Sequence, residues 1–457
     1  MSKNWYKLLE RIAPLYRHIV SPGLDKSLEI TAEYFEPFEI HRYKTSTKAW
    51  TWEIPRKYDL KDAILVDPSG KVVTNFHSEP LCVRSGSISV DSKISFSELK
   101  KHIIADSDLP ELVPWEYKYF DETTWCFCLS HNELTRLENE FSADEMFHAK
   151  IDAKFYDDDL RYGTCLLPGQ SDEIILISCN LCHPHQVNDS LSGVAVAHLL
   201  YEELKKRNNH FSYLFTFGPE FLGIISWLSH HEEWIEKIRY SMYTEMAGSP
   251  GPITLQQSFT GYSHIDAVAS QVLLEKGGED VIIKPLLHYG ICNDELVLQM
   301  PGIRIPSIAW NRGMFGGYHT NADTLENLDV ELVESMAKVQ LEVLARLDDK
   351  APASNSAERE NRTYLTRPSK YAEKLRPAQD YVPIPLFKGP IFLTGYDLYV
   401  DFRENHKLLM NINRLMLLMN GLNSCWDMAY SCGMDFADVD DFIKRLEGYQ
   451  LVKISIG

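Results

Sequence analysis

The middle of the chain alternates short apolar runs with longer amphipathic stretches. The runs are apolar on both faces and have the length of buried strands; they cover 173–179, 213–217, 241–244 and 305–310. The stretches with helical spacing cover 192–206, 263–275 and 330–347. Buried strands that alternate with helices are typical of an α/β fold, so we predict a mostly parallel sheet sandwiched by helices.

The regions on either side have different patterns. Residues 1–49 have helical spacing up to about residue 48, and we assign them to the α/β domain together with 117–348. Over 50–116, short alternating runs separated by turn residues predict a small inserted β domain. A polar stretch at 349–384 is interpreted as a linker, and the helices and final strand predicted over 385–457 suggest a winged-helix-like domain.

The composition of the chain limits the kinds of molecule that it is expected to bind. The 457 residues include 65 acidic and 46 basic side chains, for a net charge of -19, which disfavours nucleic acid and anionic membrane surfaces. The first residues lack the apolar core of a signal peptide, and no run approaches the ~18 apolar residues of a membrane span. Nine cysteines, an odd number spread over a long chain, fit reduced thiols. We therefore expect a cytoplasmic protein with no membrane partner.

The highest concentration of potential metal ligands lies directly after the first predicted strand, 173–179. Between Cys179 and Gly193 the chain carries His183, His185 and Asp189, and imidazole and carboxylate groups are ligands that zinc accepts. In a parallel sheet, ligands bind beyond the carboxyl ends of the strands, where this segment lies. The alternative is structural: Asp189 would only cap the helix that follows, with the histidines in a polar loop.

The same segment also fits two redox motifs. Cys179-x-x-Cys182-His183 matches the attachment signature of c-type haem, and the two cysteines have the spacing of a dithiol pair. Haem attachment is disfavoured because the chain lacks an export signal and Cys179 ends an apolar strand. The dithiol is disfavoured because the residues between the cysteines lack proline and the start of a helix.

Further polar residues follow the other predicted strands. Glu220 and Glu245 each come after a strand, and a later loop contains Asp294. The last strand leads to a loop that carries Arg312 and the string Tyr318-His-Thr-Asn-Ala-Asp323. Each segment is a weak signal alone. Because the strands are expected side by side, their polar ends can converge on one crevice.

The order of these residues resembles the co-catalytic zinc aminopeptidases, whose relatives include glutamate carboxypeptidases and glutaminyl cyclases. The matching positions are His183, Asp189-Ser-Leu-Ser-Gly193, Glu220 with Gly223, Glu245-Met-Ala-Gly248, Asn293-Asp-Glu295 and Tyr318-His-Thr-Asn-Ala-Asp-Thr324. More narrowly, the chain resembles aminopeptidase-like proteins with an inserted small β domain and a C-terminal winged helix, which are linked to surface-polysaccharide biosynthesis. The strings Cys182-His-Pro184, Trp52-Glu-Ile-Pro55 and Trp125-Cys-Phe-Cys-Leu129 carry that narrower resemblance.

This resemblance implies a role for each matched residue. His183, Asp189 and Glu245 would hold one zinc ion. Asp189 would bridge toward a second ion, whose imidazole ligand would be His319. Glu220 would be the general base that takes a proton from the attacking water.

Three departures from the family pattern favour one zinc ion over two. Phe221 stands where the family has a glutamate ligand of the second metal, and its side chain cannot bind a cation. Glu245 replaces an aspartate and is one methylene longer. His185 stands where a carboxylate usually orients the metal-binding histidine. We therefore expect a single-metal variant in which His183, Asp189 and Glu245 are joined by His319 as a further candidate ligand.

The substrate is expected to be peptide-like or an acylated small molecule with an amide bond. Arg312 is a candidate for pairing with a substrate carboxylate or phosphate, although a salt bridge within this acidic protein is the commoner role. Asp294 and Tyr318 are candidates for orienting ligands or an oxyanion, and a structural role in their loops is equally compatible. The other histidines, at 198, 210, 230, 231 and 264, are interpreted as structural or solvated.

Two other functions remain open. Phe221 is also compatible with a catalytically inactive aminopeptidase-like protein that serves binding or scaffolding. The winged-helix-like domain is compatible with a DNA-binding regulator, but four aspartates on or near its third helix would face phosphates. We expect that domain to pack against protein, for example in a homo-oligomer, and to bind no nucleic acid.

Overall fold

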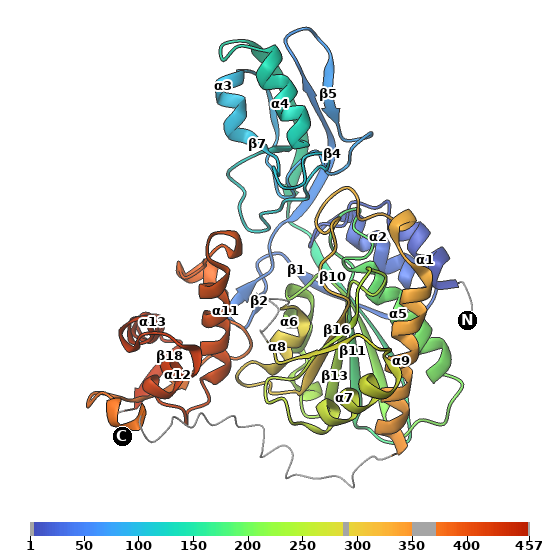
Figure 1. Ribbon diagram of the computed structural model, residues 1–457, viewed down its shortest axis with the longest axis vertical. Helices are drawn as coiled ribbons and strands as arrows, with labels where there is room; N and C mark the ends of the chain where they lie inside the picture. The colour runs from blue at the N-terminus through green and yellow to red at the C-terminus, as the bar shows by residue number, and fades with distance from the viewer. Residues whose placement is uncertain (1–3, 287–291, 350–371, 456–457) are drawn as a thin grey trace.

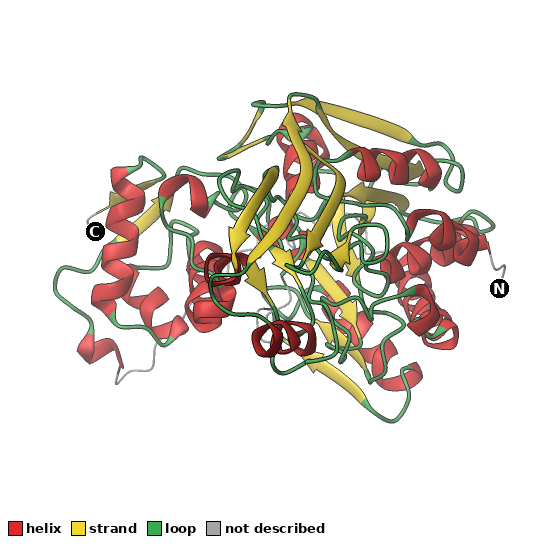
Figure 2. Cartoon of the chain, turned by 90° about the horizontal axis from the view of Figure 1, so that it is seen from above, coloured by secondary structure: helices red, strands yellow, loops and turns green. Residues whose placement is uncertain are grey.

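The computed structural model describes residues 4–286, 292–349 and 372–455 (Figure 1). An α/β region forms the largest part, a smaller sheet with two helices stands above it, and a helical module lies to one side (Figure 1). The two termini lie at opposite ends of the molecule when it is seen from above (Figure 2). Most of the linker that we expected over 349–384 lies outside the described residues.

The α/β region is built on an eight-stranded sheet. Its strands, in spatial order, are β1 (Glu39–Lys44), β10 (Asp159–Leu167), β12 (Ser212–Gly218), β11 (Ile174–Asn180), β13 (Ile238–Thr244), β16 (Ser307–Asn311), β14 (Ile253–Gln256) and β15 (Val281–Lys284). The central strands β12, β11, β13 and β16 are parallel, and every residue in them is buried. These are the four strands that the apolar runs predict.

The sheet as a whole is mixed: β11–β12, β11–β13, β13–β16 and β14–β15 pair parallel, so four of its seven pairings are parallel. Antiparallel pairing joins β1 to β10, β10 to β12 and β14 to β16. Strand β1 also lies inside the segment that we expected to be helical up to residue 48. Its exposed and half-buried side chains give an edge strand little apolar pattern to recognise.

Helices cover both faces of the sheet. On one face lie α1 (Asn4–Ile12), α2 (Pro22–Thr31), α5 (Leu191–Leu204), α7 (His264–Lys276) and α9 (Val330–Asp349), which share a hydrophobic core with the strands. On the other face lie α6 (Leu222–His230) and α8 (Asp294–Gln299), which contribute to a second core with Trp227 and Val297. Among the described residues, no helix is both long and apolar enough to cross a bilayer.

The smaller sheet has its own hydrophobic core. Its strands, in spatial order, are β5 (Val72–Asn75), β4 (Lys57–Val66), β9 (Met146–Tyr156) and β6 (Val90–Ser95), all antiparallel. Helices α3 (Phe96–Leu99) and α4 (His131–Glu140) pack on it through Phe96 and Leu137. Because β9 lies beyond residue 116, this sheet extends past the boundary that we expected for the β insertion. Short strand pairs β2 (Lys48–Ala49) with β3 (Trp52–Glu53), and β7 (Ile103–Ile104) with β8 (Phe127–Cys128), flank it.

The C-terminal module consists of short helices and one strand pair. Its α11 (Phe402–Leu418), α12 (Cys425–Cys432) and α13 (Phe436–Gly448) follow β17 (Val382–Pro385), which pairs antiparallel with β18 (Val452–Ser455). Its hydrophobic core takes in Leu296 and Met300 from the α/β region, and Phe221 packs against the same core. The Arg304 guanidinium donates to the carbonyls of Leu417 (2.9 Å) and Met419 (3.2 Å), which ties the module to the sheet.

Candidate metal centre

The predicted site residues come from the same ends of adjacent parallel strands. His183 follows β11, Glu220 follows β12, Glu245 follows β13 directly, and His319 lies in the loop after β16. Since β12, β11, β13 and β16 are neighbours, these loops meet at one edge of the sheet. The convergence that the strand order predicts is therefore present.

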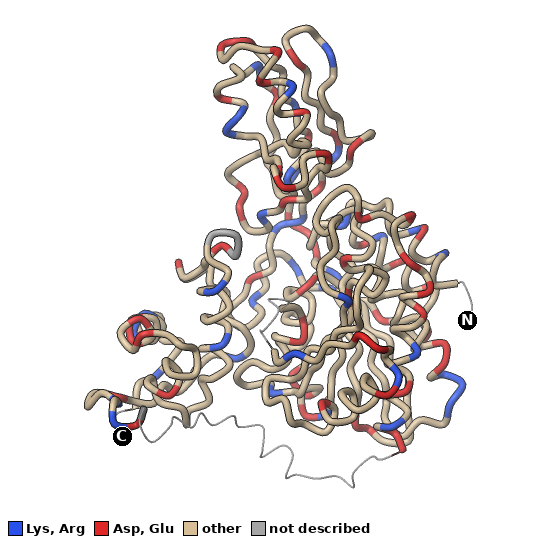
Figure 3. Tube along the Cα trace, viewed as in Figure 1, with Lys and Arg blue, Asp and Glu red and all other residues tan. Residues whose placement is uncertain are grey.

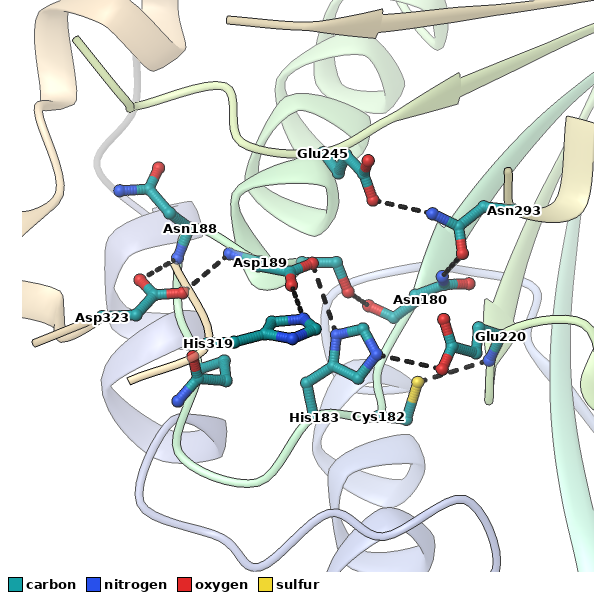
Figure 4. A network of polar contacts seen from close by, with 12 residues as sticks. Asn180, Cys182, His183, Asn188, Asp189, Glu220, Glu245, Asn293, His319 and Asp323 are labelled. Atoms are coloured by element: carbon teal, nitrogen blue, oxygen red, sulfur yellow. Dashed lines mark hydrogen bonds and ion pairs between the residues drawn. The ribbon is translucent and has the colours of Figure 1, made fainter. Parts of the chain in front are cut away.

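Asp189 lies between two imidazoles at this edge (Figure 4). Its Oδ1 is 3.3 Å from His183 Nδ1, and its Oδ2 is 2.8 Å from His319 Nε2. The Asp189 side chain is 2% exposed, and that of His319 is 18% exposed. Burial would raise the pKa of Asp189, but the facing imidazoles of His183 and His319 hold it below its usual range.

Three side-chain atoms of Asp189 and the two imidazoles lack a hydrogen-bond partner among the described residues. His183 Nδ1, Asp189 Oδ2 and His319 Nε2 are all buried, and none of them makes a hydrogen bond despite the short separations. Buried polar atoms in folded proteins are almost always paired. Imidazole nitrogen and carboxylate oxygen are also the donor types that zinc prefers. The site therefore fits a divalent metal ion that is held by His183, Asp189 and His319.

Glu245 belongs to a hydrogen-bond network that adjoins this group. Its Oε2 accepts a hydrogen bond from Asn293 Nδ2 at 2.8 Å (Figure 4). The same oxygen accepts a hydrogen bond from the Tyr243 hydroxyl at 2.8 Å. Burial first, and then the negative charge of Asp189, raise the pKa of Glu245 well above its ordinary value. The two buried carboxylates therefore repel one another, and a nearby cation would relieve that repulsion.

Gly193 allows this close approach of Asp189 and Glu245. A Cβ atom at Gly193 would lie 1.9 Å from the carbonyl oxygen of Thr244, the last residue of β13. Any larger side chain would push the start of α5 away from the end of β13. Steric exclusion therefore explains why a glycine ends the Asp189-Ser-Leu-Ser-Gly193 turn.

Glu220 is the more accessible carboxylate of the site. Its Oε1 is 3.2 Å from His183 Nε2, and its side chain is 19% exposed. Its backbone N–H donates to Cys182 Sγ at 3.3 Å (Figure 4). A carboxylate that reaches both solvent and the imidazole is placed to exchange protons with a bound water or substrate.

Two buried charged residues hold the loop that carries the ligand candidates. Asp323 accepts hydrogen bonds from the backbone N–H groups of Asn188 (2.7 Å) and Asp189 (3.0 Å). Arg17, on the N-terminal segment, donates to the carbonyls of Leu181 (2.8 Å) and His183 (2.7 Å). The family motif includes Asp323. Arg17 was missed, because a single arginine after an amphipathic helix gives no signal of burial.

Several residues of the site have left-handed backbone conformations. The φ angles are 70° at His183, 53° at Phe221, 47° at Met246 and 54° at His319. Such conformations cost about 1–3 kcal/mol each in residues with a side chain, and they concentrate at functional sites. Their presence in all four loops supports a site that is held in one geometry by its surroundings.

An aromatic wall covers the two imidazoles, and sequence reasoning missed it. Trp115 packs on His183 and His319 with ring centroids 4.6 and 4.7 Å away, and Tyr117 stacks on Trp115 at 4.8 Å. The Trp115 backbone N–H donates to the carbonyl of His319 at 2.7 Å. The segment before residue 120 carries a Trp-Glu-Tyr-Lys-Tyr-Phe string whose aromatic alternation was the available signal. This wall fixes the ring planes and limits the access of water.

The structure places the remaining predicted residues differently. Tyr318 stacks on His319, with ring centroids 3.9 Å apart. Asp294 is buried and accepts hydrogen bonds from the Ser178 hydroxyl and the Phe221 backbone N–H, so it supports the strand ends. The Arg312 guanidinium donates to the carbonyls of Ala247 (3.1 Å) and Gly251 (2.7 Å) and to the Ser335 hydroxyl (2.6 Å). It anchors the loop after β13.

Phe221 is partly buried among apolar side chains. Its ring packs against both the core beneath α6 and the core of the C-terminal module. The position at which the aminopeptidases are expected to have a second glutamate is therefore used for contact between two parts of the molecule. His185 is half-buried on the same loop as His183, and its ring lies 6.4 Å from that of Tyr16.

Comparison with known proteins agrees with this architecture. A relative from Clostridium acetobutylicum is 29% identical over 451 residues, which cover 98% of this chain and 96% of the relative. Its provisional name is polysaccharide biosynthesis protein with aminopeptidase-like domain. The crystal structure of a provisionally named peptidase from the same organism has a TM-score of 0.70 and 26% identity, and covers 99% of this chain and 96% of its own.

A more distant likeness concerns the fold alone. BSAP, a zinc aminopeptidase from Bacillus subtilis, has a TM-score of 0.57 and 14% identity, and the match covers 77% of this chain and 96% of that one. The mixed sheet and its helices are thus those of an aminopeptidase-like fold. A family model described as a domain of unknown function, DUF4910, matches residues 6–350. The chain therefore belongs to the DUF4910 family.

Proposed function

We propose that this protein is a metal-dependent hydrolase that cleaves an amide bond in a peptide-like or acylated small molecule. The observation that carries the proposal is the buried Asp189 between His183 and His319, with ligand atoms that have no hydrogen-bond partner. The peptidase-like fold of its relatives supports the same reaction class. The provisional name of the Clostridium relative supports a substrate from polysaccharide biosynthesis.

His183, Asp189 and His319 would hold the metal, with Glu245 as a further ligand after a small movement. Zinc fits this donor set, and one ion is favoured because Phe221 supplies no ligand for a second. When bound, such an ion lowers the pKa of water and polarises a carbonyl group. Asn293 keeps the Glu245 carboxylate in place through its amide.

Glu220 would act as the general base and then as the general acid. Its carboxylate would accept a proton from the attacking water and return that proton to the leaving amine. Its 3.2 Å contact with His183 Nε2 and its partial exposure support this role. The Tyr318 ring, which is stacked on His319, would place its hydroxyl near the reacting carbonyl as a hydrogen-bond donor.

Metal analysis and one substitution test the proposal. We expect close to one zinc per chain after reconstitution, and Glu220→Gln should lower turnover by on the order of 10²-fold or more with unchanged metal content. The matched control is Glu326→Gln, an exposed carboxylate beyond the His319 loop, which should keep full activity. Zinc content well below one per chain after reconstitution would refute the proposal.

A second candidate function is a catalytically inactive binding or scaffold protein. The observation in its favour is Phe221, whose side chain serves packing at a position where the resemblance leads us to expect a ligand. It predicts metal binding without hydrolysis over amide, ester and acyl-sugar panels. Turnover that disappears in Glu220→Gln would exclude it.

For the C-terminal module we propose a winged-helix-like domain that contacts protein and binds no DNA. Helix α13 carries Asp438, Asp440 and Asp441, and Lys and Arg are interspersed with acidic residues throughout the module (Figure 3). Phosphates would be repelled from such a surface. Packing of its core on Leu296 and Phe221 supports a structural role, and the nine free cysteines support a reducing compartment such as the cytoplasm.

A further inference from the structure

We propose that Cys182 is a metal ligand, and that its sulfur forms an alternative metal position together with His183 and Glu220. Such a position would bind zinc or a softer divalent ion such as cadmium. The zinc ligands that the family resemblance implies do not include this cysteine. We call the three residues the thiolate position.

The distances within this group are those of a metal site before the ion binds. One ligand atom from each of the three residues lies within 4.8 Å of the other two. His183 Nε2 and Glu220 Oε1 are already 3.2 Å apart. Ligand atoms around a tetrahedral zinc are separated by roughly 3.5 Å, so small side-chain movements suffice. Among residues 4–286, 292–349 and 372–455, the three metal-binding side chains whose ligand atoms all lie within 4.8 Å of one another are those of Cys182, His183 and Glu220.

The surroundings of Cys182 offer its sulfur one hydrogen-bond donor. Its Sγ accepts a hydrogen bond from the Glu220 backbone N–H at 3.3 Å. The buried Arg17 guanidinium donates to the carbonyls of Leu181 and His183, the residues on either side of the cysteine. A metal ion would bind this sulfur as the thiolate, and the thiol proton would be released to solvent.

Cys179 provides an internal contrast three residues earlier. It is equally buried, but its sulfur lies 3.8 Å from the Gly193 carbonyl, to which the thiol can only donate. Cys179 packs in the apolar core shared with α5. The two cysteines of the Cys179-x-x-Cys182 string therefore have different environments, and only Cys182 adjoins the imidazole and the carboxylate.

The thiolate position shares two residues with the proposed hydrolytic site. A metal ion bound there would occupy the Glu220 carboxylate, which the proposed function needs as a proton acceptor. Only this consequence, competition with turnover, rests on the proposed function. Metal binding by Cys182 is independent of it and is tested by spectroscopy.

The experiment titrates metal-free, full-length protein with Cd²⁺ and follows the ultraviolet absorption of the cadmium–thiolate bond. We expect a band that saturates at one ion per chain. Cys182→Ser should abolish it, and Glu220→Gln should weaken the affinity by about tenfold or more. Cys179→Ser and Cys126→Ser, at a buried and a half-buried cysteine outside the position, should keep the band. Its absence from the wild type, or its persistence in Cys182→Ser, would overturn the proposal.

X-ray absorption at the zinc edge of the wild-type protein provides a measurement that needs no variant. A sulfur neighbour near ~2.3 Å is expected when the position is filled, whereas a shell of nitrogen and oxygen alone contradicts it. These readouts separate this inference from the proposed function. A chain that hydrolyses its substrate but shows no sulfur ligand refutes only the thiolate position, and a chain with a sulfur ligand and no turnover refutes only the hydrolase.

Discussion

His319 Nε2 lies 2.8 Å from Asp189 Oδ2, yet the two atoms form no hydrogen bond. A contact of this length in a buried site normally carries a proton along the line between the atoms. Here both atoms are instead without a hydrogen-bond partner, as is Nδ1 of the neighbouring His183. We interpret this relationship as two ligands that await a cation.

Metal removal should therefore destabilise the protein. A ligand at a concentration 100 times its Kd stabilises the native state by about 2.7 kcal/mol, and chelation removes that contribution. We expect a lower Tm in the presence of a chelator, restored by Zn²⁺, and a much smaller change in His319→Ala. His77→Ala, at an exposed histidine of the smaller sheet region, should respond like the wild type. Thermal unfolding with and without chelator measures this, and an unchanged Tm on chelation would contradict it.

Trp115 should increase the affinity for zinc, although it is not itself a metal ligand. Trp115→Leu removes the ring that packs on both His183 and His319, so the imidazoles gain rotational freedom. We expect weaker zinc binding by about tenfold and a loss of stability of about 3 kcal/mol. Calorimetric titration with zinc gives the affinity.

The matched control for that experiment is Trp125→Leu. Trp125 stacks on His102 at 4.0 Å in the same part of the chain but does not touch the metal candidates. It should lose stability without losing zinc affinity. If both variants bind zinc equally well, Trp115 has only a packing role.

Restoring the glutamate that the family has at position 221 should not restore a second metal. Phe221→Glu places a carboxylate between two hydrophobic cores, and its backbone is fixed by the hydrogen bond to Asp294. We expect a loss of about 2–4 kcal/mol in unfolding free energy and no gain in bound zinc. Phe221→Leu should cost less and leave the zinc content unchanged. Elemental analysis and chemical denaturation check both, and a second equivalent of zinc in Phe221→Glu would contradict this account.

His198 should make the stability of the fold fall in mildly acidic solution. Burial lowers the pKa of His198 from 6.5 to about 4, and its ring packs between Tyr34 and Phe35. Between those pH values the unfolded chain binds a proton that the folded chain does not. Stability is therefore lost as the pH falls from about 6.5 to about 4, by up to ~3 kcal/mol from this group.

Denaturant unfolding at a series of pH values tests this. His198→Gln should flatten the decrease over that window, because glutamine takes up no proton. The same substitution at exposed His77 serves as the control. An equal pH dependence in His198→Gln and the wild type would show that other groups are responsible.

The sequence predicted most reliably those strands that are buried on both faces. Strands β11, β12 and β13 are buried on both faces, so their apolar runs were readable, and the loops after them held the chemistry. The edge strand β1 has mostly exposed and half-buried residues, and the long β9 pairs with β4 and β6, which lie far away in the chain. Those elements were missed for that reason.

The same limit applies to the site. His183, Asp189 and His319 could be proposed because their residue types and order carry chemistry. Trp115 and Arg17 act through packing and through contacts with the backbone, and both come from segments far away in the chain. Their roles depend on which loops the fold brings together, which local patterns do not specify.

Phe221 connects the proposed base to the far end of the polypeptide. Its peptide neighbour is Glu220, while its ring is covered by the C-terminal module, which lies beyond the region 6–350 that the family model matches. A protein truncated after that region would expose this ring to solvent next to Glu220. The C-terminal module therefore contacts the residue that follows the proposed base, and binding of another molecule to that module would reach Glu220 through a single peptide unit.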